Sequence, residues 1–203
     1  MKRYECLEIL ASMIAQDDII VANVGNTSLE LHSVRPSEAN LYNVNLGQCT
    51  PVALGLALGL PSRRVLALDG DGNLLMNLAS LADVAHHNPK NLCIIVFDNE
   101  AYESPGGLPS ATARGADLEK IADGSGITKA VTVSNVEDFK ENLRMILNEN
   151  EVSVLVAKIE TGTVKISQLN MDGKRNKYIF AGHIEETERK PVLRLRSQSP
   201  LVE

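Results

Sequence analysis

Short apolar runs rich in valine and isoleucine alternate with helical patterns along this chain, and this alternation constrains its fold more than any other feature. Four runs are pronounced and two are weaker, at Ile19–Val24, Val65–Leu68, Leu92–Phe97 and Val152–Ile159, and at Leu41–Val44 and Ala130–Val133. Nearly continuous apolar runs of this length are typical of strands that are buried on both faces of a parallel sheet.

The segments between the runs have helical spacing, at about Tyr4–Ala15, Cys49–Leu60, Leu74–His86, Asp117–Ala122 and Val136–Asn148. The last of them follows Ser134–Glu137, which has the spacing of a capping box. Strands that alternate with helices predict an α/β domain, with a parallel sheet flanked by helices on both faces. We expect a single domain in residues 1–160, followed by a C-terminal tail in residues 161–203 that docks in part through Tyr178, Ile179 and Phe180.

Composition limits the possible functions. A chain of 203 residues with 44% hydrophobic residues is long enough for one α/β domain and too short for two of full size. A net charge of −6 argues against a general affinity for nucleic acid or for an acidic membrane surface. The uncharged apolar run at residues 52–60 is too short to cross a bilayer. The three cysteines, Cys6, Cys49 and Cys93, form no C-x-x-C pair, so the sequence indicates no zinc or iron–sulfur site and fits a reduced, cytoplasmic compartment.

Polar residues follow three of the predicted strands at the point where each strand ends. Gly25 follows the first run, Gly70-Asp71-Gly72 follows the second strong run, and Asp98-Asn99 ends the third. Ligands of open parallel sheets bind at the carboxyl ends of the strands. The fold could therefore bring Gly25, Asp71 and Asn99 to one edge.

Three interpretations of the Gly-Asp-Gly segment are open from the residues alone. Asp71-Gly72 fits a tight turn, because both residue types tolerate left-handed backbone angles. The spacing of Asp69, Asp71 and Asn73 also matches the first three ligands of a calcium loop, but Leu74 stands where that loop requires glycine and Ser80 where it requires glutamate.

The third interpretation is an anion site. Glycines at a strand end let the backbone approach a phosphate, and the helix predicted after Asn73 directs its free N–H groups at the same anion. A carboxylate such as that of Asp71 can lie beside a diphosphate only if a cation separates them, and Mg²⁺ binds in this manner. Asn99 would add a neutral amide oxygen.

At this point the sequence resembles a known family. Gly70-Asp71-Gly72, followed by an asparagine at the end of the next apolar strand, is similar to the signature of thiamine-diphosphate-dependent enzymes. The resemblance implies that Asp71, Asn99 and the backbone carbonyl of Ala101 hold Mg²⁺, which in turn holds the diphosphate of the cofactor. The cofactor-binding residues that it implies are Gly25, Asn26, Thr27, Leu46, Gly47, Gly70, Asp71, Gly72, Asn73, Asn99, Ala101 and Tyr102.

Individual positions carry more specific expectations from the same resemblance. Leu46-Gly47 is similar to a pair in which a large apolar side chain holds the two rings of the cofactor in a V shape. The turn from Gly25 to Thr27 resembles one that contacts the diphosphate and the pyrimidine, and Asn73 takes the place of a residue that contacts the diphosphate. The similarity extends from about Asp18 to Ile159 and implies the thiamine-diphosphate-binding fold of the domain that holds the diphosphate, called the PP domain.

Enzymes of this family also use a second domain, the PYR domain, which supplies a glutamate to the pyrimidine ring. No part of this chain resembles a PYR domain, so the resemblance implies a partner subunit that carries one, and we assign no catalytic acid or base within this chain. The length and organisation are most similar to the β subunits of sulfopyruvate decarboxylase and of phosphonopyruvate-decarboxylase-like proteins. That subgroup implies the decarboxylation of a small 2-oxo acid by a hetero-oligomer that contains a homodimer of this subunit.

Two other functions stay open, namely half of a carboligase similar to acetolactate synthase and a non-catalytic module that binds thiamine diphosphate. The loop after Asn99 departs from the subgroup, because Glu103 and Leu108 stand where relatives tend to have glycine and glutamine. Glu103 places a negative charge where an anionic substrate could arrive. Arg114, in the same loop, could clamp a carboxylate or sulfonate, although an ordinary surface arginine is the alternative. His32 could approach the same edge.

Overall fold

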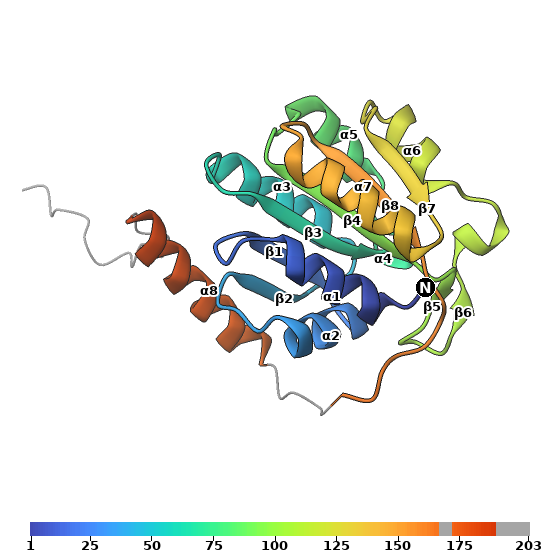
Figure 1. Cartoon of the computed structure of the whole chain (residues 1–203), viewed down its shortest axis with the longest axis horizontal. Coiled ribbons are helices and arrows are strands. Elements are labelled where there is room, and N and C mark those ends of the chain that lie inside the picture. Colours follow the sequence, from blue (N-terminus) through green and yellow to red (C-terminus); the bar gives the residue numbers. More distant parts are fainter. Residues whose placement is uncertain (167–171, 190–203) are drawn as a thin grey trace, which may run out of the picture.

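The computed structural model describes residues 1–166 and 172–189. Within them a six-stranded sheet has the order β2-β1-β3-β4-β8-β7, and every neighbouring pair of its strands is parallel (Figure 1). Its strands are β1 (Ile19–Asn23), β2 (Asn40–Val44), β3 (Val65–Gly70), β4 (Leu92–Asp98), β7 (Ala130–Val133) and β8 (Ser153–Lys158). The six predicted strands and the α/β class are confirmed.

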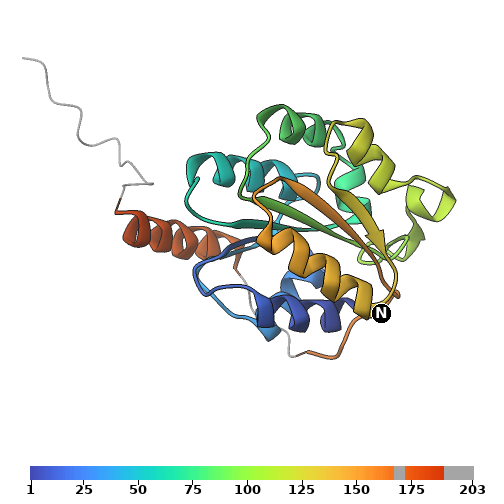
Figure 2. The same ribbon diagram turned by 45° about the horizontal axis from the view of Figure 1, so that its top comes forward.

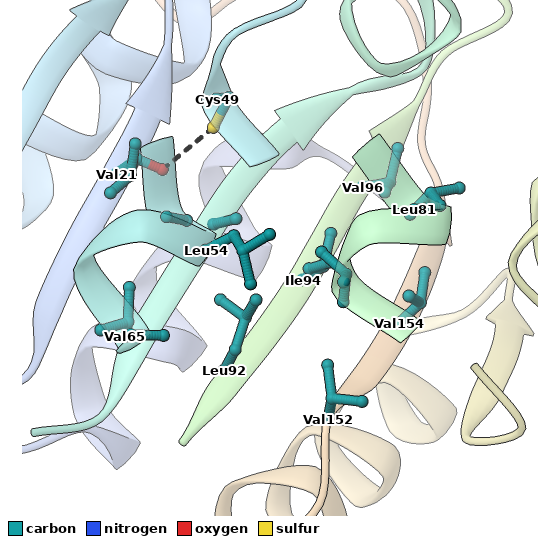
Figure 3. Packing of buried hydrophobic residues seen from close by; sticks show 14 of the residues in the cluster. Val21, Cys49, Leu54, Val65, Leu81, Leu92, Ile94, Val96, Val152 and Val154 are labelled. Atoms are coloured by element: carbon teal, nitrogen blue, oxygen red, sulfur yellow. Dashed lines mark hydrogen bonds between the residues drawn. The ribbon is translucent and has the colours of Figure 1, made fainter. Parts of the chain in front are cut away.

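Helices cover both faces of the sheet because successive residues of each central strand point to opposite faces. One face packs α1 (Arg3–Met13), α2 (Asn26–Val34) and α7 (Val136–Asn148) against residues such as Ile20, Leu66 and Ile95. The other face packs α3 (Cys49–Gly59), α5 (Ala79–His87) and α6 (Leu118–Gly124) against residues such as Val65 and Ile94 (Figure 3). Each fully buried aliphatic side chain of these two cores contributes roughly 1.5–3 kcal/mol.

The three cysteines belong to these cores. Cys6 and Cys93 pack on the first face and Cys49 on the second, and all three thiols are free and buried. Burial raises the pKa of the Cys6 thiol to about 12 and raises the pKa values of Cys49 and Cys93 as well. They are apolar packing residues in this fold.

Two helix boundaries differ from the prediction. The helix expected over residues 74–86 is divided into α4 (Asp71–Leu75) and α5, and the side-chain amide of Asn77, which lies at the break, donates to the carbonyl of Gly47 at 2.9 Å. The N-cap of α7 is Asn135 and not Ser134, because the Asn135 side chain accepts from the backbone N–H of Asp138 at 2.9 Å. Serine and asparagine are equally good N-caps, so the sequence is compatible with either residue as the N-cap of this helix.

Two helices of the structure were not predicted. The buried face of α2 is mostly polar, with Thr27, Ser28 and Glu30, and therefore lacks the apolar periodicity of an amphipathic helix. The second is α8 (Gly173–Glu188), which lies beside β2 and projects past the edge of the sheet (Figure 2). Of the three residues expected to dock the tail only Phe180 is buried, together with Ala181 and Ile184, while Tyr178 and Ile179 are exposed.

The remaining short elements follow β4. They are β5 (Ala101–Tyr102) and β6 (Leu108–Pro109), which form a small antiparallel hairpin, and the 3₁₀ helix η1 (Ala111–Arg114). Across residues 1–166 and 172–189, the helices are all too short or too polar to span a bilayer. The rest of the predicted tail, residues 167–171 and 190–203, lies outside the described residues.

Candidate cofactor site

A cavity of about 90 Å³ lies at the carboxyl ends of β1, β3 and β4. Because these strands are adjacent and parallel, the residues that follow them meet at one edge of the sheet. Of the twelve residues expected to bind the cofactor, nine line this cavity, namely Asn26, Thr27, Gly70, Asp71, Gly72, Asn73, Asn99, Ala101 and Tyr102.

The other three expected residues lie around the cavity and do not line it. Gly25 has a φ of 104° and caps α2, and a Cβ atom added there would lie 3.1 Å from the Ser104 hydroxyl. The N–H of Gly47 donates to the side-chain oxygen of Asn73 at 2.9 Å. Leu46 is 58% exposed, so its side chain is free to contact a molecule outside this chain.

Asp71 is the most buried carboxylate that lines the cavity, with 2% of its surface exposed. Its Oδ2 accepts hydrogen bonds from the hydroxyls of Ser110 at 2.5 Å and Thr112 at 3.2 Å. Burial raises the pKa of Asp71, the Ser110 hydrogen bond opposes this effect, and the neighbouring Asp98 charge adds to it. A bound divalent cation would compensate this desolvated charge directly.

Asn99 is held by the tight turn that follows β4. Its Oδ1 accepts from the backbone N–H of Ala101 at 3.1 Å, and Glu100 between them adopts a left-handed φ of 60°. An amide oxygen has two lone pairs, so this hydrogen bond leaves Oδ1 able to bind a cation.

The side chain of Asn73 connects the end of β3 to the turn at Gly47. Its amide nitrogen donates to the buried carboxylate of Asp69, and its oxygen accepts from Gly47. Asp69 is fixed in turn by the Thr50 hydroxyl and by the Gly70 N–H, each at 2.9 Å. The side chain of Asn73 is therefore committed to this chain, which leaves its backbone N–H as the group that could meet a diphosphate.

The cavity also contains a polar atom that needs a partner. Asn23 lines the cavity, and its Oδ1 is buried with no hydrogen-bond donor among the described residues. A buried acceptor left without a partner costs about 1–3 kcal/mol, so this position suits a ligand that brings an N–H group. An aminopyrimidine ring provides such a donor, and Gly70 leaves space beside Asn23, because a Cβ atom added at Gly70 would lie 3.2 Å from the Asn23 side-chain nitrogen. These observations fit thiamine diphosphate.

Sequence reasoning missed several residues of this site. Asn23 is the last residue of β1, but it lay inside the predicted run Ile19–Val24 and was therefore counted as a strand residue. Ser110 and Thr112 lie far along the chain from Asp71, and no local pattern indicates their contact. Arg3 also lines the cavity, and it comes from the opposite end of the sequence.

Two weaker candidates lie elsewhere. His32 lines a separate cavity of about 420 Å³ near α8, where its ring centroid is 5.2 Å from that of Tyr42. Arg114 is exposed at the end of η1.

Comparison with known proteins identifies the class that this fold and site define. Residues 23–157 match the family described as thiamine pyrophosphate enzyme, C-terminal TPP binding domain. The match covers more than half of the chain, so the chain belongs to this family.

Individual proteins that resemble this chain give a more specific comparison. It is 34% identical to sulfopyruvate decarboxylase subunit beta of Methanocaldococcus jannaschii, over 92% of this chain and 98% of that subunit. It is 31% identical to phosphonopyruvate decarboxylase of Streptomyces viridochromogenes, over 80% of this chain and 41% of that longer protein. The crystal structure of benzoylformate decarboxylase from Polynucleobacter necessarius shares the fold, with a TM-score of 0.67 at 22% identity over 80% of this chain and 34% of that one.

Gly72→Ala is expected to weaken thiamine diphosphate binding at least tenfold, as measured by calorimetric titration in saturating Mg²⁺. A Cβ atom at this position would lie 2.4 Å from the Tyr102 ring, so the ring must move and the new methyl group fills part of a small cavity. Gly182→Ala in α8 is the matched control, because a Cβ atom there meets nothing within 4 Å, and it should leave binding unchanged. Equal affinities for both variants and the native chain would show that cofactor binding does not require glycine at position 72.

Proposed function

We propose that this chain is the cofactor-binding subunit of a thiamine-diphosphate-dependent decarboxylase that acts on a small 2-oxo acid with an acidic group at C3, such as 3-sulfopyruvate or 3-phosphonopyruvate. One observation carries the proposal. Asp71, Asn99 and the unpaired acceptor of Asn23 line a single cavity at the carboxyl ends of adjacent parallel strands. The end-to-end similarity to subunits named sulfopyruvate decarboxylase subunit beta supports the substrate class.

The proposed roles follow from the site. Asp71, Asn99 and the backbone carbonyl of Ala101 would hold Mg²⁺, while Ser110 and Thr112 orient the Asp71 carboxylate. The turns at residues 25–27 and 70–73 would hold the diphosphate, and Tyr102 would close over it. Leu46 would support the cofactor rings. When bound, thiamine diphosphate supplies the electron sink that lets the 2-oxo acid lose CO₂.

A partner chain is part of the proposal. The two carboxylates that line the cavity, Asp71 and Glu103, already bind groups of this chain. We therefore assign the glutamate that would act on the pyrimidine to a PYR-domain subunit. The exposed apolar side chains of Leu46 and Met76, in turns, and of Leu108, in β6, lie near the cavity and suit a protein contact. A homodimer of this subunit within a cytoplasmic hetero-oligomer is proposed on the family resemblance.

The test begins with the tagged chain recovered from its own cells in buffer with thiamine diphosphate and Mg²⁺. Native mass spectrometry should show one co-purifying partner and bound cofactor. The recovered complex should then convert 3-sulfopyruvate or 3-phosphonopyruvate to CO₂ and the corresponding aldehyde, as followed by NMR. The separated chain should show no turnover, because it lacks the partner's glutamate.

The other outcomes identify the alternatives. A hydroxy-keto acid product in place of an aldehyde would identify a carboligase. Bound cofactor without turnover, whichever partner is added, would identify a non-catalytic binding module. A chain recovered alone and without cofactor would contradict the proposal.

A further inference from the structure

The carboxylate of Glu103 lies in the wall of the cofactor cavity, where three donors from distant segments meet it. The side-chain amide of Asn26 donates to its Oε2 at 3.1 Å, and the guanidinium of Arg3 lies 3.5 Å from the same oxygen. The backbone N–H of Gly162 donates to its Oε1. These groups come from the first turn of α1, the start of α2 and the segment after β8.

The charged donor of this group, Arg3, is held in place by contacts other than Glu103. Arg3 is only 7% exposed and is fixed by a second carboxylate, that of Glu30, with 2.9 Å between Nε and Oε2. Because Arg3 and Glu30 neutralise each other, Glu103 adds one negative charge to the cluster. Any monoanionic group that replaced the Glu103 carboxylate would leave the net charge of the cluster unchanged.

There is also room for such an exchange. Arg3 lines the cofactor cavity and also a neighbouring cavity of about 140 Å³, which Glu30 and Gly162 line as well. Glu103 is carried by the β5–β6 hairpin, whose two strands pair over only two residues each. Residues 104–109 of this hairpin are exposed, so few buried contacts oppose its withdrawal.

We propose that Arg3, Asn26 and the Gly162 N–H form a subsite for a tetrahedral oxyanion, and that Glu103 is its tethered competitor. Two ligand groups have this chemistry, namely the terminal phosphate of the cofactor and the sulfonate or phosphonate of a substrate. The second source rests on the proposed function, whereas the subsite itself does not. A tethered carboxylate competes at an effective concentration in the millimolar range or above, so its removal strengthens the binding of a free anion.

The test uses the full chain, labelled with ¹⁵N, and methanesulfonate as the probe. The NMR signals of the Gly162 amide and of the Asn26 side-chain amide report on the subsite. Methanesulfonate should bind Glu103→Ala at least tenfold more tightly than the native chain and shift both signals. Glu103→Gln, which keeps the shape of the side chain and loses its charge, should also bind the probe more tightly than the native chain.

Two controls decide whether the subsite is real. Glu160→Ala removes a mostly exposed carboxylate close to Gly162 and should behave as the native chain does. The double variant Glu103→Ala/Asn26→Ala should lose most of the gained affinity. Binding to both Glu103 variants that is no tighter than to the native chain would overturn the proposal, and so would binding that does not depend on Asn26.

A further titration separates the two sources. Glu103→Ala is first loaded with thiamine diphosphate and Mg²⁺, and methanesulfonate is then added. If the loaded protein no longer binds the probe, the subsite takes the phosphate of the cofactor. If it still binds the probe, the subsite takes the acidic group of a substrate. Because neither readout requires turnover, failure of the decarboxylase assay and failure of the subsite are distinguishable.

Discussion

Asp71→Asn is expected to weaken the Mg²⁺-dependent binding of thiamine diphosphate more than about 100-fold. Asp71 is the one charged group among the three proposed ligands, since Asn99 and Ala101 offer neutral oxygens. Without it the cation faces the diphosphate with no balancing charge from the protein. Loss of a supporting contact in a metal site typically costs about 10–100-fold in affinity, and loss of a direct ligand should cost more.

The same substitution should leave the fold intact or slightly more stable. Burial raises the pKa of Asp71. A carboxyl group whose pKa is higher in the folded state than in the unfolded state destabilises the fold once it is ionised, so its charge is a cost at neutral pH. The amide of asparagine carries no charge, and its oxygen can still accept from Ser110 and Thr112.

Two measurements check this prediction together. Calorimetric titration of cofactor in saturating Mg²⁺ reports affinity, and thermal unfolding of the cofactor-free chain reports stability. Asp83→Asn, on the exposed surface of α5, removes the same charge outside the site and should change neither quantity. An Asp71→Asn variant that binds within tenfold of the native chain would show that Asp71 is not a metal ligand.

The strands were predictable because their signal is local. A strand that is buried on both faces must be apolar at nearly every position, so β1, β3, β4 and β8 stand out as continuous runs. Prediction of helix α2 failed because its buried residues are mostly polar. Ser28 and Glu30 of α2 are buried because the Ser28 hydroxyl donates to the Asn23 carbonyl at 2.7 Å and Glu30 pairs with Arg3. The compensation for Glu30 comes from a residue 27 positions away, so no local pattern indicates it.

The residues of the site also fall into a predictable group and an unpredictable one. Asp71 and Asn99 were predictable because the carboxyl ends of adjacent parallel strands always meet, whatever lies between them. Glu103 was noticed only as a departure from relatives, and its position among Arg3, Asn26 and Gly162 required coordinates. Those contacts join three remote segments, so no sequence spacing encodes them. The proposed anion subsite therefore belongs to the tertiary structure alone.

Arg3→Met is expected to lower the free energy of unfolding by about 3–5 kcal/mol, the range measured when one partner of a buried ion pair is removed. Glu30 is 1% exposed, and its carboxylate would remain buried with its cationic partner gone. Urea unfolding of the full chain, followed by circular dichroism, measures the change. Arg144→Met, on the exposed surface of α7, should stay within about 0.5 kcal/mol of the native chain.

The double variant Arg3→Met/Glu30→Gln separates the two causes of such a loss. If the cost arises from an unpaired buried charge, neutralising Glu30 should restore most of the stability, because replacing both partners of a buried pair is often close to neutral. If the double variant is as unstable as Arg3→Met, the loss comes instead from packing of the arginine stem between α1 and α2. In the first case the ion pair adds little net stability. The function of Arg3 beside the cofactor cavity is then better explained by the donor that it presents to Glu103, which is the role that the anion subsite requires.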